Sequence, residues 1–402
     1  MLYQLSYVGL RTNRFQTIKE RPRILLCFEA LSKRESVESL HMTTETALRW
    51  SWMNVLTKKR YDMLLQQFGN LETALAEVSV EMLQELGCRE ETVLGAMNRL
   101  EEFDPDFYLK ELQKRDINFL SLEDDAYPEA LKTIADPPIF FYYKGDMSIL
   151  RQPCLSLVGR REMSDYGKRA VAEIVPGIVT SGVITVSGLA YGIDAEVAKE
   201  TMTAGGKTVA VVGHGLGMIH PKSNERLAKS ILEKGGLIVS EYPLDAFPDK
   251  YTFPARNRII AGLSLGTVVI EAAEGSGSLI TAELALEYGR DVFAVPGQIF
   301  DPGYAGCHQL ISRGHAKLVS SATDILSEIG ILPREGAQTS FSFTPESPDE
   351  ESVYGSLTTM PADLDNLSVK TTLDAATLNA ILTVLEIKGA VKNVGGGKWV
   401  RS

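Results

Sequence analysis

The segment from Asp249 to Arg258 combines basic and aromatic residues more densely than any other part of the sequence. Pro254 suits the first turn of a helix, which places Arg256 and Arg258 in or near the first turns of that helix. Cations at this end of a helix oppose the helix dipole, at a cost of roughly a few tenths of a kcal/mol. A bound phosphate would remove that cost, so the segment predicts an anion-binding helix end.

Lys250 and the rings of Tyr251 and Phe253 precede this helix. Basic residues with interleaved aromatic rings suit single-stranded nucleic acid, because each unpaired base stacks on a ring for about 1–3 kcal/mol. A second interpretation stays open at this point. Either arginine could pair with Glu241 or Glu271 and brace the edge of a sheet, and one arginine could serve each purpose.

Glycine-rich turns follow four of the six strands that the sequence predicts, among them Ser187–Asp194 and Gly275–Ser278. Gly159 comes directly after the first of these strands and is followed by Arg160 and Arg161. Glycine lets backbone N–H groups approach a ligand closely, and a helix N-terminus favours an anion. One such turn is common in any fold, but several at one sheet edge beside two arginines predict a phosphate-binding edge.

No catalytic or metal-binding constellation is evident. The histidines at 214, 220, 308 and 315 lack metal-ligand spacing with carboxylates or thiols. Ser276 and Ser278 have no nearby histidine that could act as a base. Gly206-Lys207-Thr208 resembles the end of a P-loop, but Thr201 stands where that motif requires glycine. We therefore expect no metal, no cofactor and no enzymatic activity.

The elements that must position these residues alternate between short β-branched runs and amphipathic helices from about residue 116 to 320. Buried strands of this kind predict a parallel α/β sheet covered on both faces. Ligands bind such sheets at the carboxyl ends of the strands. The predicted strands are Cys154–Val158, Val183–Ser187, Thr208–Val212, Leu237–Ser240, Thr267–Ile270 and Asp291–Val295. The predicted helices are Tyr166–Val179, Ile193–Ala204, Asn224–Glu233, Ala255–Leu263 and Leu279–Tyr288.

Other segments flank this core, which we place at 116–330. Residues 1–41 are expected to be a disordered basic tail, or to lie upstream of a true start at Met42, with a nucleic-acid-binding arm as the alternative. Residues 42–115 read as a compact bundle of short helices, and the acidic, proline-rich stretch 331–351 reads as a linker. In 352–402, a helix over Leu367–Leu385 and a hairpin around Gly395–Gly397 predict a winged-helix-like domain.

The charge, the cysteines and the lack of long apolar runs exclude several classes of protein. The chain has 402 residues, 41 of them Lys/Arg and 52 Asp/Glu, for a net charge of −11. A uniformly basic coat protein is therefore excluded. Residues 151–320 carry 17 bases and 17 acids, so a local basic groove is compatible with this charge. The four cysteines form no CxxC pair and no apolar run reaches about 18 residues, so we expect a cytoplasmic protein without a membrane span.

Longer motifs then carry a resemblance to a known family. The runs Ser187–Asp194 (SGLAYGID), Phe253–Ser264 (FPARNRIIAGLS), Ser276–Ala282 (SGSLITA) and Gly289–Gly297 (GRDVFAVPG) closely resemble the DNA-processing protein A family, also called DprA or Smf. The chain departs from that family's pattern at Arg160, at Lys199 and in the stretch Gly217–Pro221. These departures concern the details of the third loop rather than the fold.

The resemblance implies a Rossmann-like core that binds single-stranded DNA, forms a homodimer and hands the strand to the RecA recombinase in natural transformation. By motif match, it assigns DNA contacts to Arg161, Lys250, Phe253, Arg256 and Arg258. Together with the glycine-rich turns, the expected DNA-binding residues are Gly159, Arg160, Arg161, Ser187, Gly188, Gly192, Asp194, Lys250, Phe253, Arg256, Asn257, Arg258, Ser276, Gly277 and Ser278.

Two other functions remain as alternatives. Related Rossmann-like phosphoribohydrolases place a glycine-rich loop before a helix that carries a glutamate, and Ser276-Gly277-Ser278 with Glu283 is a loose analogue. Such an enzyme would release free base from nucleoside monophosphates. In the third interpretation the sheet edge is only structural and the protein is an interaction scaffold.

Overall fold

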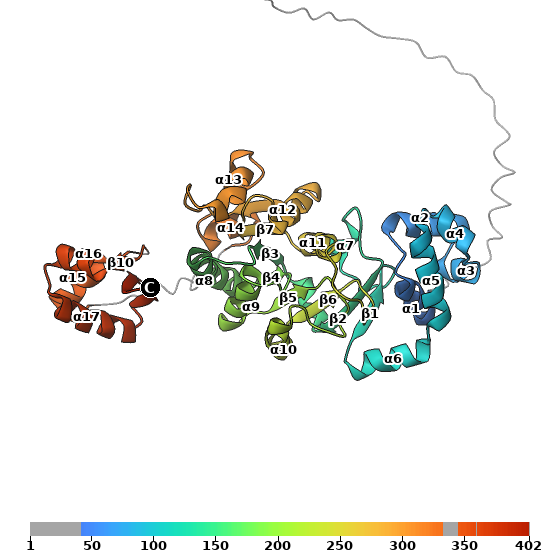
Figure 1. Ribbon diagram of the computed structural model, residues 1–402, viewed down its shortest axis with the longest axis horizontal. Coiled ribbons are helices and arrows are strands. Elements are labelled where there is room, and N and C mark those ends of the chain that lie inside the picture. The colour runs from blue at the N-terminus through green and yellow to red at the C-terminus, as the bar shows by residue number, and fades with distance from the viewer. Residues whose placement is uncertain (1–41, 333–344, 359, 402) are drawn as a thin grey trace, which may run out of the picture.

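The computed structural model describes residues 42–332, 345–358 and 360–401 (Figure 1). The predictions for the tail 1–41, and for most of the linker 331–351, lie outside the described residues. The described chain begins with a helical region, continues into a large sheet and ends in a small helix-and-ribbon domain. The α/β class with flanking helical and winged-helix domains is confirmed.

Six short helices form the first region. Threonine, asparagine, serine or aspartate side chains cap the N-termini of all but the fifth of them, which fixes where each of these helices begins. Trp50, Leu64 and Leu83 are fully buried in their shared core. The helices are α1 (Thr44–Met53), α2 (Lys58–Phe68), α3 (Leu71–Ala76), α4 (Val80–Glu85), α5 (Glu90–Glu102) and α6 (Pro105–Lys114).

A nine-stranded sheet follows, in the order β1-β2-β6-β5-β4-β3-β7-β8-β9. The seven strands from β6 to β9 are parallel, and six of them are the strands that the sequence predicts, whereas β1 and β2 extend the sheet antiparallel. The strands are β1 (Asn118–Ser121), β2 (Phe140–Gly145), β3 (Cys154–Gly159), β4 (Ile184–Ser187), β5 (Thr208–Val211), β6 (Leu237–Ser240), β7 (Gly266–Glu271), β8 (Asp291–Ala294) and β9 (Lys317–Leu318).

Helices cover both faces of this sheet (Figure 1). On one face pack α7 (Glu129–Lys132), α11 (Thr252–Leu263), α12 (Gly277–Glu287) and α13 (Ala305–Ser312). On the other pack α8 (Asp165–Thr180), α9 (Ile193–Thr203), α10 (Glu225–Glu233) and α14 (Ala322–Glu328). Three short 3₁₀ turns connect them: η1 (Met147–Arg151), η2 (Lys222–Asn224) and η3 (Pro302–Tyr304). Because the central strands are buried on both faces, their sequences are apolar without alternation.

The last domain contains α15 (Pro348–Ser356), β10 (Ala362–Asp363), α16 (Leu364–Thr371), α17 (Ala375–Ile387), β11 (Val391–Gly395) and β12 (Lys398–Arg401). It is the winged helix that the sequence predicts, although α15 begins inside the predicted linker. The single helix expected over Leu367–Leu385 is wrong. Thr372 adopts a left-handed conformation with φ of 57° and ends α16, and the Asp374 side chain then caps α17.

Within the described ranges, no helix is both long and apolar enough to cross a membrane.

Candidate nucleic-acid interface

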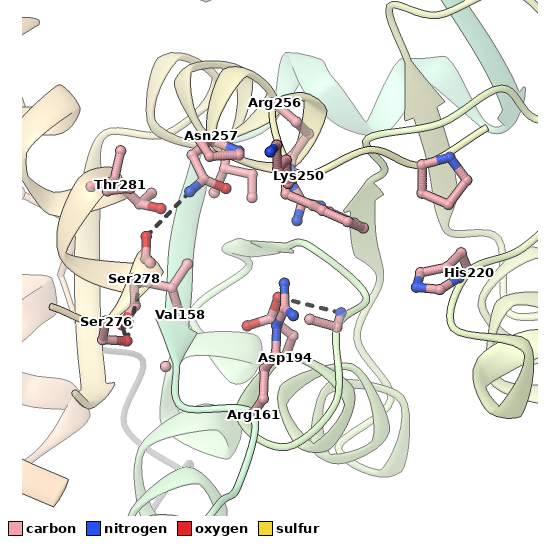
Figure 2. Close-up of a pocket in the computed structure, with 18 of the residues that line it drawn as sticks. Val158, Arg161, Asp194, His220, Lys250, Arg256, Asn257, Ser276, Ser278 and Thr281 are labelled. Carbon is pink, nitrogen blue, oxygen red and sulfur yellow. Dashed lines mark hydrogen bonds between the residues drawn. The ribbon is translucent and has the colours of Figure 1, made fainter. Parts of the chain in front are cut away.

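A cavity of about 560 Å³ opens at the carboxyl edge of the sheet, where the loops after β3 and β4 face the N-termini of α11 and α12 (Figure 2). This is the edge at which an α/β sheet binds its ligands. We call this space the main cavity. Its lining includes Gly159, Arg161, Asp194, His220, Asp249, Lys250, Phe253, Arg256, Asn257, Ser276, Gly277, Ser278 and Thr281.

Arg161 lies in the loop that follows β3, which we call the Arg161 loop. The β4–α9 loop packs against the Arg161 loop and holds it beside the main cavity. The Ile193 N–H donates to the Arg160 carbonyl oxygen at 3.1 Å. Gly192, with φ of 70°, lies so close that a Cβ atom there would approach the Arg160 oxygen to 2.3 Å. The Arg161 guanidinium stacks on the Phe253 ring, 5.4 Å from its centroid. This contact aligns a cation and an aromatic face on one wall of the cavity.

Arg160 turns away from the main cavity and is not part of its lining. Its guanidinium pairs with Glu162 at 3.2 Å and with the fully buried Glu271 at 3.6 Å. Glu271 also accepts hydrogen bonds from the backbone N–H and the hydroxyl of Ser164. The adjacent arginines of this loop therefore differ in role: Arg160 neutralises a buried carboxylate, and Arg161 faces the open space.

Arg256 is nearly fully buried, yet it forms part of the cavity wall. Its Nη1 donates to the carbonyl oxygens of Gly188, at 2.7 Å, and Val211. Burial lowers the pKa of Arg256 to about 10, against the opposing influence of Asp194. The guanidinium therefore remains charged at neutral pH and supplies a fixed positive charge at the floor of the cavity.

Arg258 lies on the other side of the same helix and makes no contact with the main cavity. Its guanidinium binds Glu241 through two nitrogens, at 2.5 and 3.0 Å, and Asp136 at 3.3 Å. Burial alone lowers the pKa of Arg258, but these two carboxylates raise it and the net shift is upward. Arg258 therefore braces the sheet edge, as the second interpretation of this segment predicts, and the binding of an anion by Arg256 stays a prediction.

Asp194 organises the turn between β4 and α9. Its Oδ2 accepts the backbone N–H of Gly188 at 3.0 Å and that of Ala190 at 3.4 Å, and the Ser187 hydroxyl donates to the Asp194 backbone oxygen. Burial raises the pKa of Asp194, although Arg256 and the two backbone N–H groups counteract that shift. Asp194 thus faces the cavity but is engaged in holding the loop, and Ser187 is buried outside the cavity lining.

Another side of the main cavity is formed by α11, α12 and the residues just before these helices (Figure 2). The predicted residues on this side are Lys250, Asn257, Ser276, Gly277 and Ser278. Lys250 is exposed and lies 4.9 Å from the centroid of the Tyr251 ring. The Asn257 side chain donates to the Gly277 carbonyl oxygen at 3.2 Å, which ties α11 to the start of α12. The Ser276 and Ser278 hydroxyls bond to each other at 2.7 Å beside that helix N-terminus. Such an end can donate N–H groups and hydroxyls to an anion.

Within the described part of the chain, neither Arg161 nor Lys250 forms an ion pair or a hydrogen bond. Both cations are therefore held near the cavity by ring contacts and remain available to a ligand. Together with Arg256 they give the main cavity three positive charges, which face the negative carboxylates of Asp194 and Asp249. The arrangement can hold a polyanion whose bases pack against Phe253.

Sequence reasoning missed His220, Asp249 and Thr281 as lining residues. His220 belongs to an irregular loop after β5, where no periodicity indicates which side chains face inward. Glu283, the acid of the phosphoribohydrolase analogy, is exposed on α12 and lies outside the cavity lining. Among residues 42–332, 345–358 and 360–401, no three His, Cys, Asp or Glu side chains are grouped to hold a metal ion.

Comparisons with known proteins agree with this geometry. A family model described as DNA recombination-mediator protein A matches residues 118–330, and the DprA winged helix domain matches residues 339–397. DNA processing protein DprA of Streptococcus pneumoniae is 46% identical over 242 residues, which are 60% of this chain and 83% of that protein. Protein Smf of Escherichia coli K12 is 42% identical over 243 residues, 60% of this chain and 62% of that protein.

The fold comparison points the same way. The X-ray structure of DprA from Streptococcus pneumoniae superposes with a TM-score of 0.61 and 39% sequence identity, over 72% of this chain and 99% of that one. The family model spans the whole sheet, including every loop that lines the main cavity. The chain belongs to the DNA recombination-mediator protein A family.

Proposed function

We propose that this protein binds single-stranded DNA in the main cavity and serves DNA processing in natural transformation and homologous recombination. The observation that carries the proposal is that three cationic side chains and one aromatic ring line the same cavity, namely Arg161, Lys250, Arg256 and Phe253. Cations that neutralise phosphates supply affinity for any sequence, and a ring beside them favours unpaired bases.

The shape of the site favours a single strand over a duplex. A volume of about 560 Å³ is that of a small-molecule pocket, which a nucleotide with its base turned inward can enter. In a duplex the bases are stacked and paired, so presenting one to Phe253 would cost a few kcal/mol. A duplex would contact only the rim through its phosphates.

The test is a comparison of single-stranded and duplex oligonucleotides by gel shift and fluorescence anisotropy. Arg161→Ala and Lys250→Glu are expected to weaken single-strand binding for every sequence and to flatten its salt dependence. Lys234→Glu is the matched control, because Lys234 follows α10 and precedes β6, at the opposite edge of the sheet. Unchanged affinity in both cavity variants would reject the site.

The finer role that we propose is to protect incoming single-stranded DNA and to load the RecA recombinase onto it, with the protein acting as a homodimer. The family description as a recombination mediator supports this role. RecA filament formation on strands coated by a single-strand-binding protein should then accelerate when this protein is added. No acceleration, with DNA binding intact, would confine the function to binding and protection.

We propose that the protein is not an enzyme of the phosphoribohydrolase type. Glu283, which that chemistry would need beside the ligand, lies outside the cavity lining. Incubation with nucleoside monophosphates should therefore release no free base, as measured by chromatography. Release that disappears in Glu283→Gln would establish the enzyme instead.

A further inference from the structure

A second, smaller cleft of about 30 Å³ adjoins the main cavity. Five residues line both spaces, so the two are continuous: Arg161, Ala190, His220, Phe253 and Arg256. The cleft adds Tyr191, whose ring is half exposed, and Pro221. The cleft is too small for a base, so a ligand group that enters it must be small. We call it the His220 cleft.

The backbone of His220 is held in place by the buried His214. The His220 N–H donates to His214 Nε2 at 3.1 Å, so this ring nitrogen carries no proton. The proton of the neutral ring then lies on Nδ1, which donates to the Gly215 carbonyl oxygen at 2.9 Å. Burial lowers the pKa of His214, which keeps that imidazole neutral near physiological pH. His214 therefore positions His220 but does not itself carry charge toward the ligand.

His220 faces the cavities from the side opposite Ser276 and Ser278 (Figure 2). Its exposed ring lies 5.9 Å from the Phe253 ring, centroid to centroid, and Phe253 carries the Arg161 guanidinium at 5.4 Å. Arg256 forms the buried side of the cleft, and its Nε is buried without a hydrogen-bond partner among the described residues. Two guanidinium groups and one imidazole therefore surround a space without room for a base.

We propose that the His220 cleft binds the phosphodiester group next to the nucleotide held in the main cavity, and that protonated His220 donates a hydrogen bond to that phosphate. The inference rests on the proposed binding of single-stranded DNA and adds a second subsite to it. Phe253 and Arg161 line both subsites, so a strand that occupies both would pass beside them.

The proposed contact couples DNA binding to the protonation of the His220 ring. A phosphate bound beside an imidazole stabilises the protonated form of the ring. Binding of DNA therefore takes up a proton, and affinity rises as the pH falls through the neutral range. The titratable groups that share its two cavities or its loop contact are Arg161, Tyr191, Asp194, His214, Asp249, Lys250 and Arg256.

The experiment measures the affinity of the full chain for a labelled oligothymidylate of about 20 nucleotides at several salt concentrations, at about pH 6 and about pH 8. The wild type should bind about five- to tenfold more tightly at the lower pH, as one charge-assisted hydrogen bond predicts. The slope of log affinity against log salt should also be steeper there by about 0.7, the value for one additional phosphate on a single strand.

His220→Gln keeps a hydrogen-bonding side chain but cannot gain the proton. It should lose both the gain in affinity and the change in salt slope that the wild type shows between about pH 8 and about pH 6. His315→Gln is the matched control, because His315 is exposed and lies outside both cavities. This control should retain the full pH effect.

A wild type whose salt slope is the same at both pH values overturns the inference, and this result needs no variant. A His220→Gln protein that keeps the pH effect overturns it as well. In both cases tight binding that depends on Arg161 leaves the proposed function intact. If the wild type binds no single-stranded DNA at both pH values, the proposed function and the second subsite are rejected together.

Discussion

The guanidinium group of Arg256 occupies the space next to Gly188 that the side chain of any other residue would fill. A Cβ atom on Gly188 would approach Arg256 Nη2 to 2.5 Å, and Nη1 donates to the Gly188 carbonyl oxygen at 2.7 Å. Gly188 does not adopt a positive φ, so its backbone conformation is open to other residues. The buried arginine is thus the reason that glycine is required at this turn.

Gly188→Ala should displace Arg256 from the floor of the cavity. We expect single-strand affinity to fall about tenfold and the free energy of unfolding to fall by about 1–3 kcal/mol, as for overpacking in a buried site. Anisotropy and urea denaturation measure the two effects. Gly355→Ala is the matched control, because a Cβ atom there meets nothing within 4 Å. It should leave the affinity unchanged and, as a glycine-to-alanine change within α15, should not lower the free energy of unfolding. Wild-type binding by Gly188→Ala would show that Arg256 does not serve the site.

Arg258→Met should separate stability from binding. The substitution leaves Glu241, which is mostly buried, without its partner, and breaking such a pair costs about 3–5 kcal/mol. DNA affinity of the folded protein should stay within about twofold, because Arg258 lies outside the main cavity. Denaturation and anisotropy report the two quantities. The double variant with Glu241→Gln should recover part of the stability, and a large loss of affinity at full stability would contradict the assignment.

Phe253 and Lys250 should contribute to binding in ways that salt distinguishes. Phe253→Ala removes a stacking face and should cost about 1–3 kcal/mol of binding free energy with little change in salt slope. Lys250→Ala removes one phosphate contact, so its slope should become shallower by about 0.7. Titrations at several salt concentrations give both numbers. Equal slopes in the two variants would place Lys250 away from the phosphates.

The central sheet could be predicted because its six inner strands are runs of β-branched and apolar residues between glycine-rich turns. The outer strands could not. β2 (Phe140–Gly145) begins with four aromatic residues, which favour a strand but do not show which strand it pairs with or in which direction, and β9 is only two residues long. Both pair with strands that are already in place, and that pairing depends on tertiary structure.

In the candidate site, too, some features can be predicted from the sequence and others depend on tertiary structure. Arg256 and Arg258 are two positions apart on a helix, so they face nearly opposite directions, and helical geometry alone predicts different roles for them. Which of the two faces the ligand depends on where Glu241 lies, and only the folded sheet brings that carboxylate beside Arg258. For Arg160 the decisive contact is Glu271, which follows it by more than a hundred residues.

Ser164 should link the stability of the Arg161 loop to the buried carboxylate beneath it. Its hydroxyl accepts the Gly167 N–H at 3.0 Å, which caps α8, and donates to Glu271 at 3.0 Å. Ser164→Ala loses a cap worth about 1 kcal/mol and a hydrogen bond to a buried charge worth about 1.5–3 kcal/mol, so its unfolding free energy should fall by about 2–4 kcal/mol.

Ser79→Ala provides the comparison, because the Ser79 hydroxyl caps α4 without any bond to a carboxylate. It should cost only about 1 kcal/mol by urea denaturation. Ser164→Thr keeps both hydrogen bonds and should stay close to the wild type in stability and in DNA affinity. If Ser164→Ala and Ser79→Ala cost the same, the hydrogen bond to Glu271 contributes nothing, and the Arg161 loop must be held by Gly192 and Ile193 alone.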